Sequence, residues 1–320
     1  MKRRVTAFAP STVANVAVGF DVLGFTFHGT GDEVTLERKD TPGVVIDAIT
    51  SAPHLPEGSD IEKISKDATL NTATVPLIAF LGDRGFRGGV RVTIKKGIAV
   101  GSGMGGSAAS AVAALVAGAA LIDVKATPAE LLKFAVLGEQ MASGAAHPDN
   151  VTPCLYGGIT VTRSVTPIDV VTIPAPAGLW AVVVKPRVRL DTKTARAVLP
   201  ANIPLTLHIK QSGQLAGFIA ACFKSDFQLL SGSLNDFVVE PHRARLIPGF
   251  AAVKAAAIKA GALGASISGS GPAVFALMQG EAKAKIIQQA MQAAFSAAGV
   301  ANDGYAAALT PEGAKVIRTE

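Results

Sequence analysis

The chain has 320 residues, of which 49% are hydrophobic and 17% charged, and its formal net charge is +6. That length exceeds one core of ordinary size and predicts two domains, while the apolar composition excludes a disordered chain. The positive charge is spread along the chain without interleaved aromatic residues, so it favours anionic small-molecule ligands over nucleic acid.

The cysteines and the apolar segments bear on location. Cys154 and Cys222 lie far apart without a metal-like spacing, which is typical of a reducing compartment. Pro10 interrupts the apolar stretch that follows the basic N-terminus, so no export signal is predicted. The longest apolar run, residues 108 to 122, is shorter than the ~18 residues of a membrane span. We therefore expect a cytoplasmic protein that does not enter a membrane.

Hydrophobic periodicity predicts two α/β halves, with a domain boundary that divides residues 1 to 164 from residues 165 to 320. In the first half we expect strands at 3–9, 33–39, 91–96 and 157–163 and helices at 107–122 and 128–144. Thr127, Pro128 and Glu130 supply an N-cap, an N1 proline and an N3 acid for the second of these helices. In the second half we expect strands at 168–173, 179–184, 264–268 and 272–278 and helices at 208–223, 248–260 and 281–298.

A glycine-rich segment lies between a predicted strand that ends at Lys96 and a predicted helix that begins near Ser107. Its glycines expose successive backbone N–H groups, and the helix N-terminus adds partial positive charge, so the segment could bind a polyphosphate. The candidate cofactor-binding residues are Gly101, Ser102, Gly103, Met104, Gly105, Gly106 and Ser107. Tight packing of a helix on a sheet would require similar glycines, so the segment alone leaves both interpretations open.

Four segments, in the right order along nearly the whole chain, resemble motifs of the GHMP kinase family and of its homoserine kinase branch. They are APSTVANVAVGFDVLG at 9–24, KGIAVGSGMGGSAASAVA at 96–113, HPDNVTPCLYGG at 147–158 and GASISGSGPAVFAL at 264–277. Several positions depart from the usual motifs: Ala17 and Val18 replace Gly and Pro, Ala99 replaces Pro, Met104 replaces Leu, and Gly106 replaces Ser. Four ordered motifs are far more specific than any one of them.

The resemblance implies a two-domain α+β fold, with an N-terminal nucleotide-binding α/β domain and a C-terminal ferredoxin-like domain. It also implies ATP-dependent phosphorylation of the hydroxyl of homoserine, a step of threonine biosynthesis, with Mg²⁺. Ser107 and Glu139 match the metal-site positions of the family. Asn150 and His147 fall where the family places groups near the reacting hydroxyl, and Asp149 is expected to serve a turn rather than to act as a base.

Homoserine is a zwitterion, so its site requires an acid for the ammonium group and cations for the carboxylate. By the resemblance, Asn15 and Asp21 take the ammonium group, whereas Arg196 and Arg243 take the carboxylate as bidentate donors. Arg245 is an alternative to Arg243.

Two other functions remain open. The altered residues 17 and 18 leave room for another small alcohol, such as mevalonate, shikimate or a sugar, as the acceptor. Gly106 in place of Ser would suit a ligand sensor that has lost turnover. A homodimer is a further expectation that the sequence does not decide.

Overall fold

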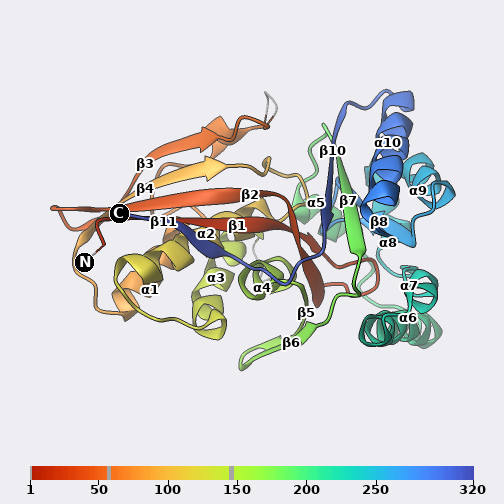
Figure 1. Cartoon of the computed structure of the whole chain (residues 1–320), viewed down its shortest axis with the longest axis horizontal. Coiled ribbons are helices and arrows are strands. Elements are labelled where there is room, and N and C mark those ends of the chain that lie inside the picture. The colour runs from red at the N-terminus through yellow and green to blue at the C-terminus, as the bar shows by residue number, and fades with distance from the viewer. Residues whose placement is uncertain (1, 56–58, 144–147) are drawn as a thin grey trace.

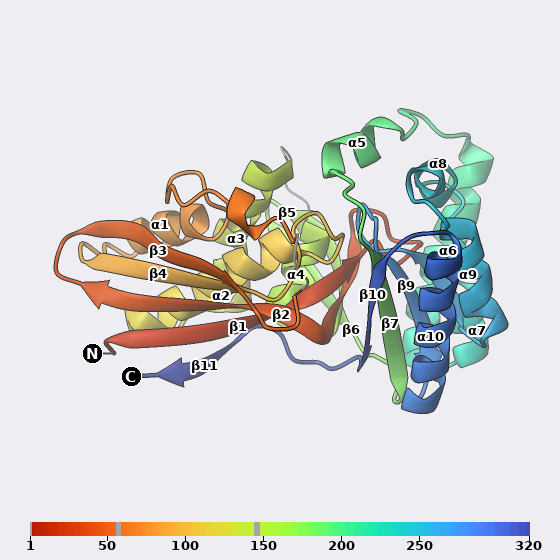
Figure 2. The ribbon, with the colours of Figure 1, turned by 90° about the horizontal axis from the view of Figure 1, so that it is seen from above.

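Two β-sheets, each covered by helices, organise the chain (Figure 1). The structure is a computed structural model that describes residues 2–55, 59–143 and 148–320. Seen from above, the two sheets lie beside each other, and the helices that cover the second sheet are at the far end of the molecule from both termini (Figure 2). This arrangement confirms the predicted two-domain α+β fold.

The larger sheet has seven strands, and a core runs along one of its faces. Its central path follows the order β11-β1-β2-β4-β3, with β5 added to β2 and β6 added to β5. Only the β3–β4 pair among these described strands is parallel. The strands are β1 (Arg4–Ala14), β2 (Leu23–Lys39), β3 (Gly43–Ser51), β4 (Gly89–Lys96), β5 (Ile159–Val165), β6 (Ile168–Ile173) and β11 (Lys315–Thr319).

Four helices cover one face of the larger sheet, as Figure 1 shows. They are α1 (Thr74–Asp83), α2 (Gly106–Leu121), α3 (Pro128–Ser143) and α4 (Pro148–Tyr156), and the short η1 (Ile61–Lys63) lies near β3. Helix α2 is rich in alanine and almost wholly buried, which allows it to approach both the sheet and its helical neighbours. The predicted capping box of α3 is confirmed: the Thr127 amide donates to Glu130 Oε2 at 2.8 Å and the Glu130 amide to Thr127 Oγ1 at 3.3 Å. The Thr127 amide is also the main reason that the pKa of Glu130 falls to about 2.

The smaller sheet has the strand order β10-β7-β9-β8 and is antiparallel throughout its described strands. Its strands are β7 (Leu179–Pro186), β8 (Gly264–Ile267), β9 (Val274–Gln279) and β10 (Asn302–Ala308). Helices α9 (Phe250–Lys259) and α10 (Glu281–Ala297) pack on it and bury a second core. The remaining elements are α5 (Thr192–Ala197), α6 (Leu205–Lys224), α7 (Phe227–Gly232), α8 (Glu240–Arg243) and η2 (Ala244–Leu246). The succession of one strand, helices, two strands, a helix and a strand is the ferredoxin-like pattern that the resemblance implied.

The strands of the two sheets are not separated at residue 165 of the chain. Strand β6 follows that position but pairs with β5 in the larger sheet. Strand β11, at the C-terminal end, returns to the same sheet and pairs with β1. The larger domain is therefore built from both ends of the chain, and the smaller sheet is inserted between β6 and β11.

Most of the predicted elements are present with shifted ends. Strands β1 and β2 extend well beyond the predicted 3–9 and 33–39, because residues 10–14 of β1 continue to pair with residues 24–31 of β2. Elements β3, α1, α4, α5, α7, α8, β10 and β11 were not predicted.

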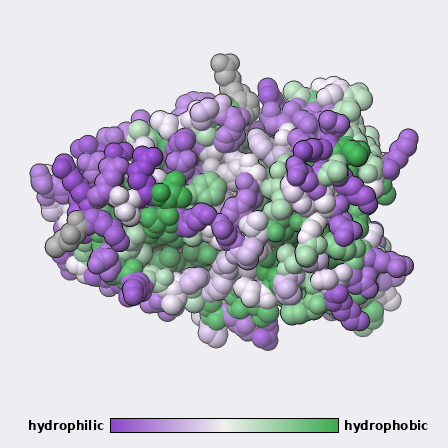
Figure 3. All heavy atoms as spheres, in the orientation of Figure 1, coloured by the Kyte–Doolittle hydropathy of each residue, from purple (hydrophilic) through white to green (hydrophobic). Residues whose placement is uncertain are grey.

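On the face shown in Figure 3, hydrophilic residues are densest toward the end that holds both termini, apolar residues gather near β11 and α2, and further apolar residues are scattered over the smaller domain. Across residues 2–55, 59–143 and 148–320, no helix is long and apolar enough to cross a membrane.

Candidate active site

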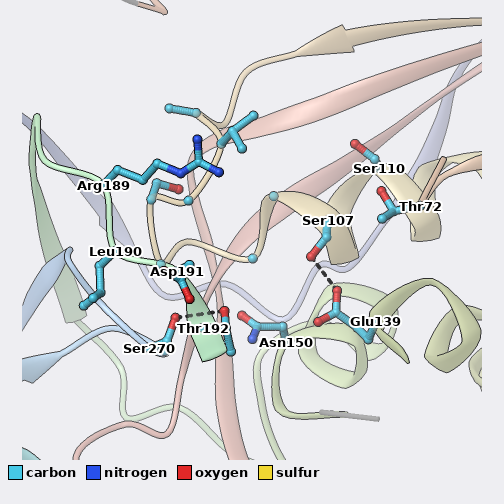
Figure 4. Close-up of a pocket in the computed structure, with 18 of the residues that line it drawn as sticks. Thr72, Ser107, Ser110, Glu139, Asn150, Arg189, Leu190, Asp191, Thr192 and Ser270 are labelled. Carbon is cyan, nitrogen blue, oxygen red and sulfur yellow. Dashed lines mark hydrogen bonds between the residues drawn. The ribbon is translucent and has the colours of Figure 1, made fainter. Parts of the chain in front are cut away.

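A cavity of about 350 Å³ lies between the two domains and brings the predicted motifs together. Figure 4 shows residues from both domains around it, with Ser107 and Glu139 on one side and Arg189 and Leu190 on the other. Twelve of the residues predicted to form the site line this cavity: Asn15, Asp21, Gly101, Ser102, Gly103, Gly105, Gly106, Ser107, Glu139, Asn150, Arg196 and Arg243. Met104 is an exception, because its side chain packs in the core of the larger domain. His147 lies outside the described residues.

The glycine-rich segment forms a loop that bends through the left-handed region at three of its glycines, with φ of 63° at Gly101, 77° at Gly103 and 69° at Gly105. Gly103 is also enclosed, since a Cβ atom there would lie 2.6 Å from the Gly271 carbonyl oxygen. The Ser268 hydroxyl donates to the Gly103 carbonyl oxygen at 2.7 Å. The third motif, in the smaller domain, therefore supports the backbone of this loop.

Gly106 differs from the other glycines of the loop. It is the first residue of α2, and its φ does not lie in the left-handed region. The conformation of residue 106 therefore does not require glycine.

A buried group of three polar residues, Asp32, Lys96 and Ser110, anchors this loop and was missed by the sequence analysis. The Asp32 carboxylate forms an ion pair with Lys96 and accepts hydrogen bonds from the Ser110 hydroxyl at 2.6 Å and the Gly97 amide at 3.0 Å. The Lys96 ammonium also donates to the Gly106 carbonyl oxygen at 2.8 Å. The group connects β2, β4 and the first turn of α2. No sequence signal distinguished Asp32, because it stands beside Glu33 in a strand that also carries several other charged residues.

Ser107 and Glu139 meet at the edge of the cavity, and their hydrogen bond is drawn in Figure 4. The Ser107 hydroxyl, at the start of α2, donates to Glu139 Oε1 of α3 at 2.6 Å. Glu139 is only 5% exposed, so it is not the solvated helix residue that a Glu usually is. A carboxylate and a hydroxyl are hard oxygen ligands of the kind that Mg²⁺ prefers, and this ion usually keeps several waters. No cluster of three or more His, Cys, Asp or Glu suited to a metal occurs within the described ranges.

The loop between β1 and β2 carries Asn15 and Asp21, which both adopt a left-handed backbone conformation with φ of 67° and 61°. The Asn15 side chain donates to the Gly269 carbonyl oxygen at 2.8 Å and accepts from the Asp21 amide at 2.9 Å. Asn15 thus joins the first motif to the third and fixes the position of Asp21.

Two arginines from the smaller domain approach this loop. Arg196, in α5, donates through Nη2 to both carboxylate oxygens of Asp21 at 2.8 Å. Arg243, in α8, is 2% exposed and donates to the carbonyl oxygens of Ala195 at 2.9 Å and Gly269 at 3.1 Å. Burial, and next the charge of Arg196, lower the pKa of Arg243.

The predicted carboxylate site is thus a cluster of two like charges. Both guanidinium groups lie 5.2 Å from the centre of the Phe20 ring. Arg245, the alternative to Arg243, is exposed at the surface, whereas Arg243 lines the cavity.

Helix α4 presents Asn150 at the same cavity. The Thr12 hydroxyl, from β1, donates to Asn150 Oδ1 at 2.7 Å and so orients the amide. Asp149 belongs to the first turn of α4 and is buried.

Comparison with known sequences and structures decides the family. Residues 71–158 match the GHMP kinases N terminal domain, and residues 218–297 match the GHMP kinases C terminal domain. The chain belongs to the GHMP kinase family. It is 42% identical to the homoserine kinase of Chlorobium phaeobacteroides, in an alignment that covers 98% of this chain and 100% of that protein. It is also 42% identical to the homoserine kinase of Xylella fastidiosa, over 97% of this chain and 93% of that protein.

Solved structures agree with the sequence relatives. The crystal structure of a homoserine kinase from Cytophaga hutchinsonii superposes with a TM-score of 0.94 and 44% identity, covering 99% of this chain and 98% of that one. The L. major mevalonate kinase has a TM-score of 0.71 at 19% identity, over 95% of this chain and 96% of that one, and shares the fold.

In this GHMP kinase the cavity also contains polar residues to which the sequence analysis gave no role. Thr192, from the start of α5, and Ser270, from the third motif, lie within 3.3 Å through their hydroxyl oxygens, as Figure 4 shows. Arg189 lines the cavity near Gly101 and forms an ion pair with Asp60 at 3.4 Å. Arg189 and Thr192 belong to the connection that follows β7. Their polar character is typical of any surface loop, so nothing in the sequence distinguished them.

Proposed function

We propose that this GHMP kinase transfers the γ-phosphoryl group of ATP to the hydroxyl of L-homoserine, giving O-phospho-L-homoserine and ADP in threonine biosynthesis. One observation carries the proposal. A single cavity contains a backbone loop suited to phosphates, a buried carboxylate beside a hydroxyl, and a separate group with one acid and two arginines. The full-length relatives named homoserine kinase support the same substrate.

The nucleotide end of the cavity would bind the phosphates of ATP mainly through backbone groups. The N–H groups of Gly101 to Gly106 and the N-terminus of α2 supply partial positive charge without side-chain reorganisation. Ser107 and Glu139 would hold Mg²⁺, which when bound neutralises charge on the transferring phosphoryl group. The Asp32–Lys96 ion pair fixes the first turn of α2 relative to the loop.

The acceptor end would bind the zwitterion by charge. Asp21 would take the ammonium group, with its position fixed by Asn15, and Arg196 and Arg243 would take the carboxylate. Asn150 would orient the hydroxyl toward the phosphoryl group, and His147 stays a prediction for the same role. Phosphoryl transfer requires mainly positioning and charge neutralisation, so we assign no side-chain base, and the hydroxyl proton goes late to the phosphate itself.

A coupled assay of ADP formation with homoserine, threonine, mevalonate and shikimate tests the proposal. We expect homoserine to give the highest kcat/KM, and omission of Mg²⁺ to abolish turnover. Higher kcat/KM with mevalonate or shikimate would refute the substrate while leaving the kinase class intact. ATP and homoserine binding without turnover would instead favour a ligand sensor. A cytoplasmic location and a homodimer stay predictions.

A further inference from the structure

Two residues that the proposed function assigns to opposite ends of the substrate are bonded to each other. Arg196 Nη2 lies 2.8 Å from both carboxylate oxygens of Asp21. Asp21 belongs to the β1–β2 loop of the larger domain and Arg196 to α5 of the smaller one. The contact therefore joins the two domains across the acceptor end of the cavity, and a substrate that uses both residues has to open it.

We propose that the Asp21–Arg196 ion pair makes this site selective for zwitterions. An amino acid that carries an ammonium group and a carboxylate gives each residue a new partner of opposite charge, so one ion pair is exchanged for two. A ligand with a carboxylate but no ammonium group takes Arg196 and separates Asp21 from its cation. A ligand with an ammonium group but no carboxylate takes Asp21 and separates Arg196 from this carboxylate. This inference rests on the proposed function, because it takes homoserine as the ligand of the site.

The exposure of the pair sets the size of the effect. The Arg196 and Asp21 side chains are 40% and 33% exposed, so water screens their attraction and the pair can open at modest cost. A pair of this kind is expected to weaken binding of a singly charged ligand by about two- to fivefold. The cost of opening the ion pair adds to the loss of the contact that the singly charged ligand cannot make. The ion pair therefore increases the selectivity for zwitterions over singly charged ligands but is not its only source.

Phe20 explains how Arg196 can change partners without leaving the site. The guanidinium groups of Arg196 and Arg243 both lie 5.2 Å from the centre of this ring, at a distance typical of cation–π contacts. Phe20 therefore holds both cations near each other, and their mutual repulsion contributes to the lowered pKa of Arg243. A substrate carboxylate that binds near both would relieve this repulsion, which favours exchange of Arg196 from Asp21 to the ligand.

The test is Asp21→Asn, with dissociation constants measured by calorimetry in the presence of ADP and Mg²⁺. Asparagine preserves the shape of the side chain and tolerates the left-handed conformation at this position. Three ligands are compared: homoserine, 4-hydroxybutanoate, which lacks the ammonium group, and 2-amino-1,4-butanediol, which lacks the carboxylate. We expect Asp21→Asn to weaken homoserine binding by at least about tenfold. The same variant should tighten 4-hydroxybutanoate binding by about two- to fivefold, because Arg196 no longer has to be separated from a carboxylate.

A matched variant checks the other half of the pair. Arg196→Gln should weaken homoserine binding and tighten binding of 2-amino-1,4-butanediol by a similar two- to fivefold factor, that is, about the strength of a partly exposed ion pair. Asp303→Asn serves as the control, since Asp303 and Arg187 form an ion pair of the same type, at 2.9 Å and 3.2 Å, outside the cavity. This control should leave all three dissociation constants unchanged.

The outcomes separate the two proposals. If Asp21 only contacts the ammonium group, Asp21→Asn will leave the dissociation constant of 4-hydroxybutanoate unchanged, and the inference is wrong even though homoserine is the substrate. Tighter binding of 4-hydroxybutanoate by Asp21→Asn, together with tighter binding of 2-amino-1,4-butanediol by Arg196→Gln, supports it. If the parent enzyme does not phosphorylate homoserine, the proposed function fails, whatever the variants bind.

Discussion

The two ends of the cavity are built in different ways. The nucleotide end is a backbone structure: its loop bends at glycines, the third motif packs against it, and a buried ion pair anchors it. The acceptor end depends on long side chains from the β1–β2 loop, α5 and α8, which meet around Phe20. A backbone site tolerates little change, whereas a site of side chains can be altered residue by residue.

The strongest way to test the nucleotide end is Glu139→Gln. Glutamine can still accept the hydrogen bond from Ser107, so we expect the fold to persist. Turnover should nevertheless fall by at least roughly a hundredfold, because the variant removes a charge that would hold Mg²⁺ against the transferring phosphoryl group. The measurement is kcat at saturating ATP, homoserine and Mg²⁺.

Glu130→Gln provides the matched control for that experiment. Glu130 lies in the same helix, is remote from the cavity, and caps the N-terminus of α3, a role that glutamine also fills. Its kcat should equal that of the parent. Activity of Glu139→Gln within a few-fold of the parent would remove Glu139 from the site.

The next largest effect is expected for Gly103→Ala, which tests whether the nucleotide end is as rigid as its contacts indicate. An added Cβ would lie 2.6 Å from the Gly271 carbonyl oxygen and 2.7 Å from that of Ser268, at a residue with φ of 77°. Strain of this kind costs about 2 kcal/mol, so kcat/KM for ATP should fall roughly thirtyfold. The dissociation constant of homoserine should change much less. Equal losses for both ligands would mean that the two ends are not separate.

Asn150→Leu tests the acceptor end of the cavity. If the amide orients the attacking hydroxyl, kcat should fall by roughly tenfold with a smaller change in the KM of homoserine, since the contact strengthens as the hydroxyl attacks. Thr12→Val, which removes the hydroxyl that donates to Asn150 Oδ1, should act in the same direction and more weakly. A rise in the KM of homoserine with unchanged kcat would show that Asn150 only binds the substrate.

The sequence predicted features best where particular residue types determine the local backbone conformation. The glycines at 101–106 and the motif at 264–277 were identified from the sequence, and the structure brings residues of both together in one cavity. The cap of α3 was predicted because Thr127 and Glu130 act locally, within a single helical turn.

Contacts between distant segments were harder to predict. Asp32 and Lys96 are 64 residues apart, and only the pairing of β2 with β4 brings them together. Strand β11 was missed because five exposed residues have no hydrophobic alternation, and its pairing with β1 depends on the return of the chain from the smaller domain. The Asp21–Arg196 contact spans 175 residues, and the family resemblance implied a role for each residue without indicating that the two would bind each other.

The smallest effect is expected for Gly106→Ser, which restores the serine that the family usually has at this position. Residue 106 has an ordinary helical conformation at the start of α2, where serine is readily accommodated. The added Cβ would lie 3.1 Å from Ile98 Cγ2, so the Ile98 side chain has to shift by a few tenths of an ångström. If it does, the new hydroxyl can donate to a phosphate and tighten ATP binding by ~1 kcal/mol, about fivefold in the KM of ATP. Gly106→Ala introduces the same Cβ without the hydroxyl, so the ratio of the two KM values isolates the hydrogen bond from the packing change. Equal KM values for the two variants would show that the hydroxyl does not reach the phosphates, and a large loss in both would show that Ile98 cannot move and that the nucleotide end depends on glycine for space at this position.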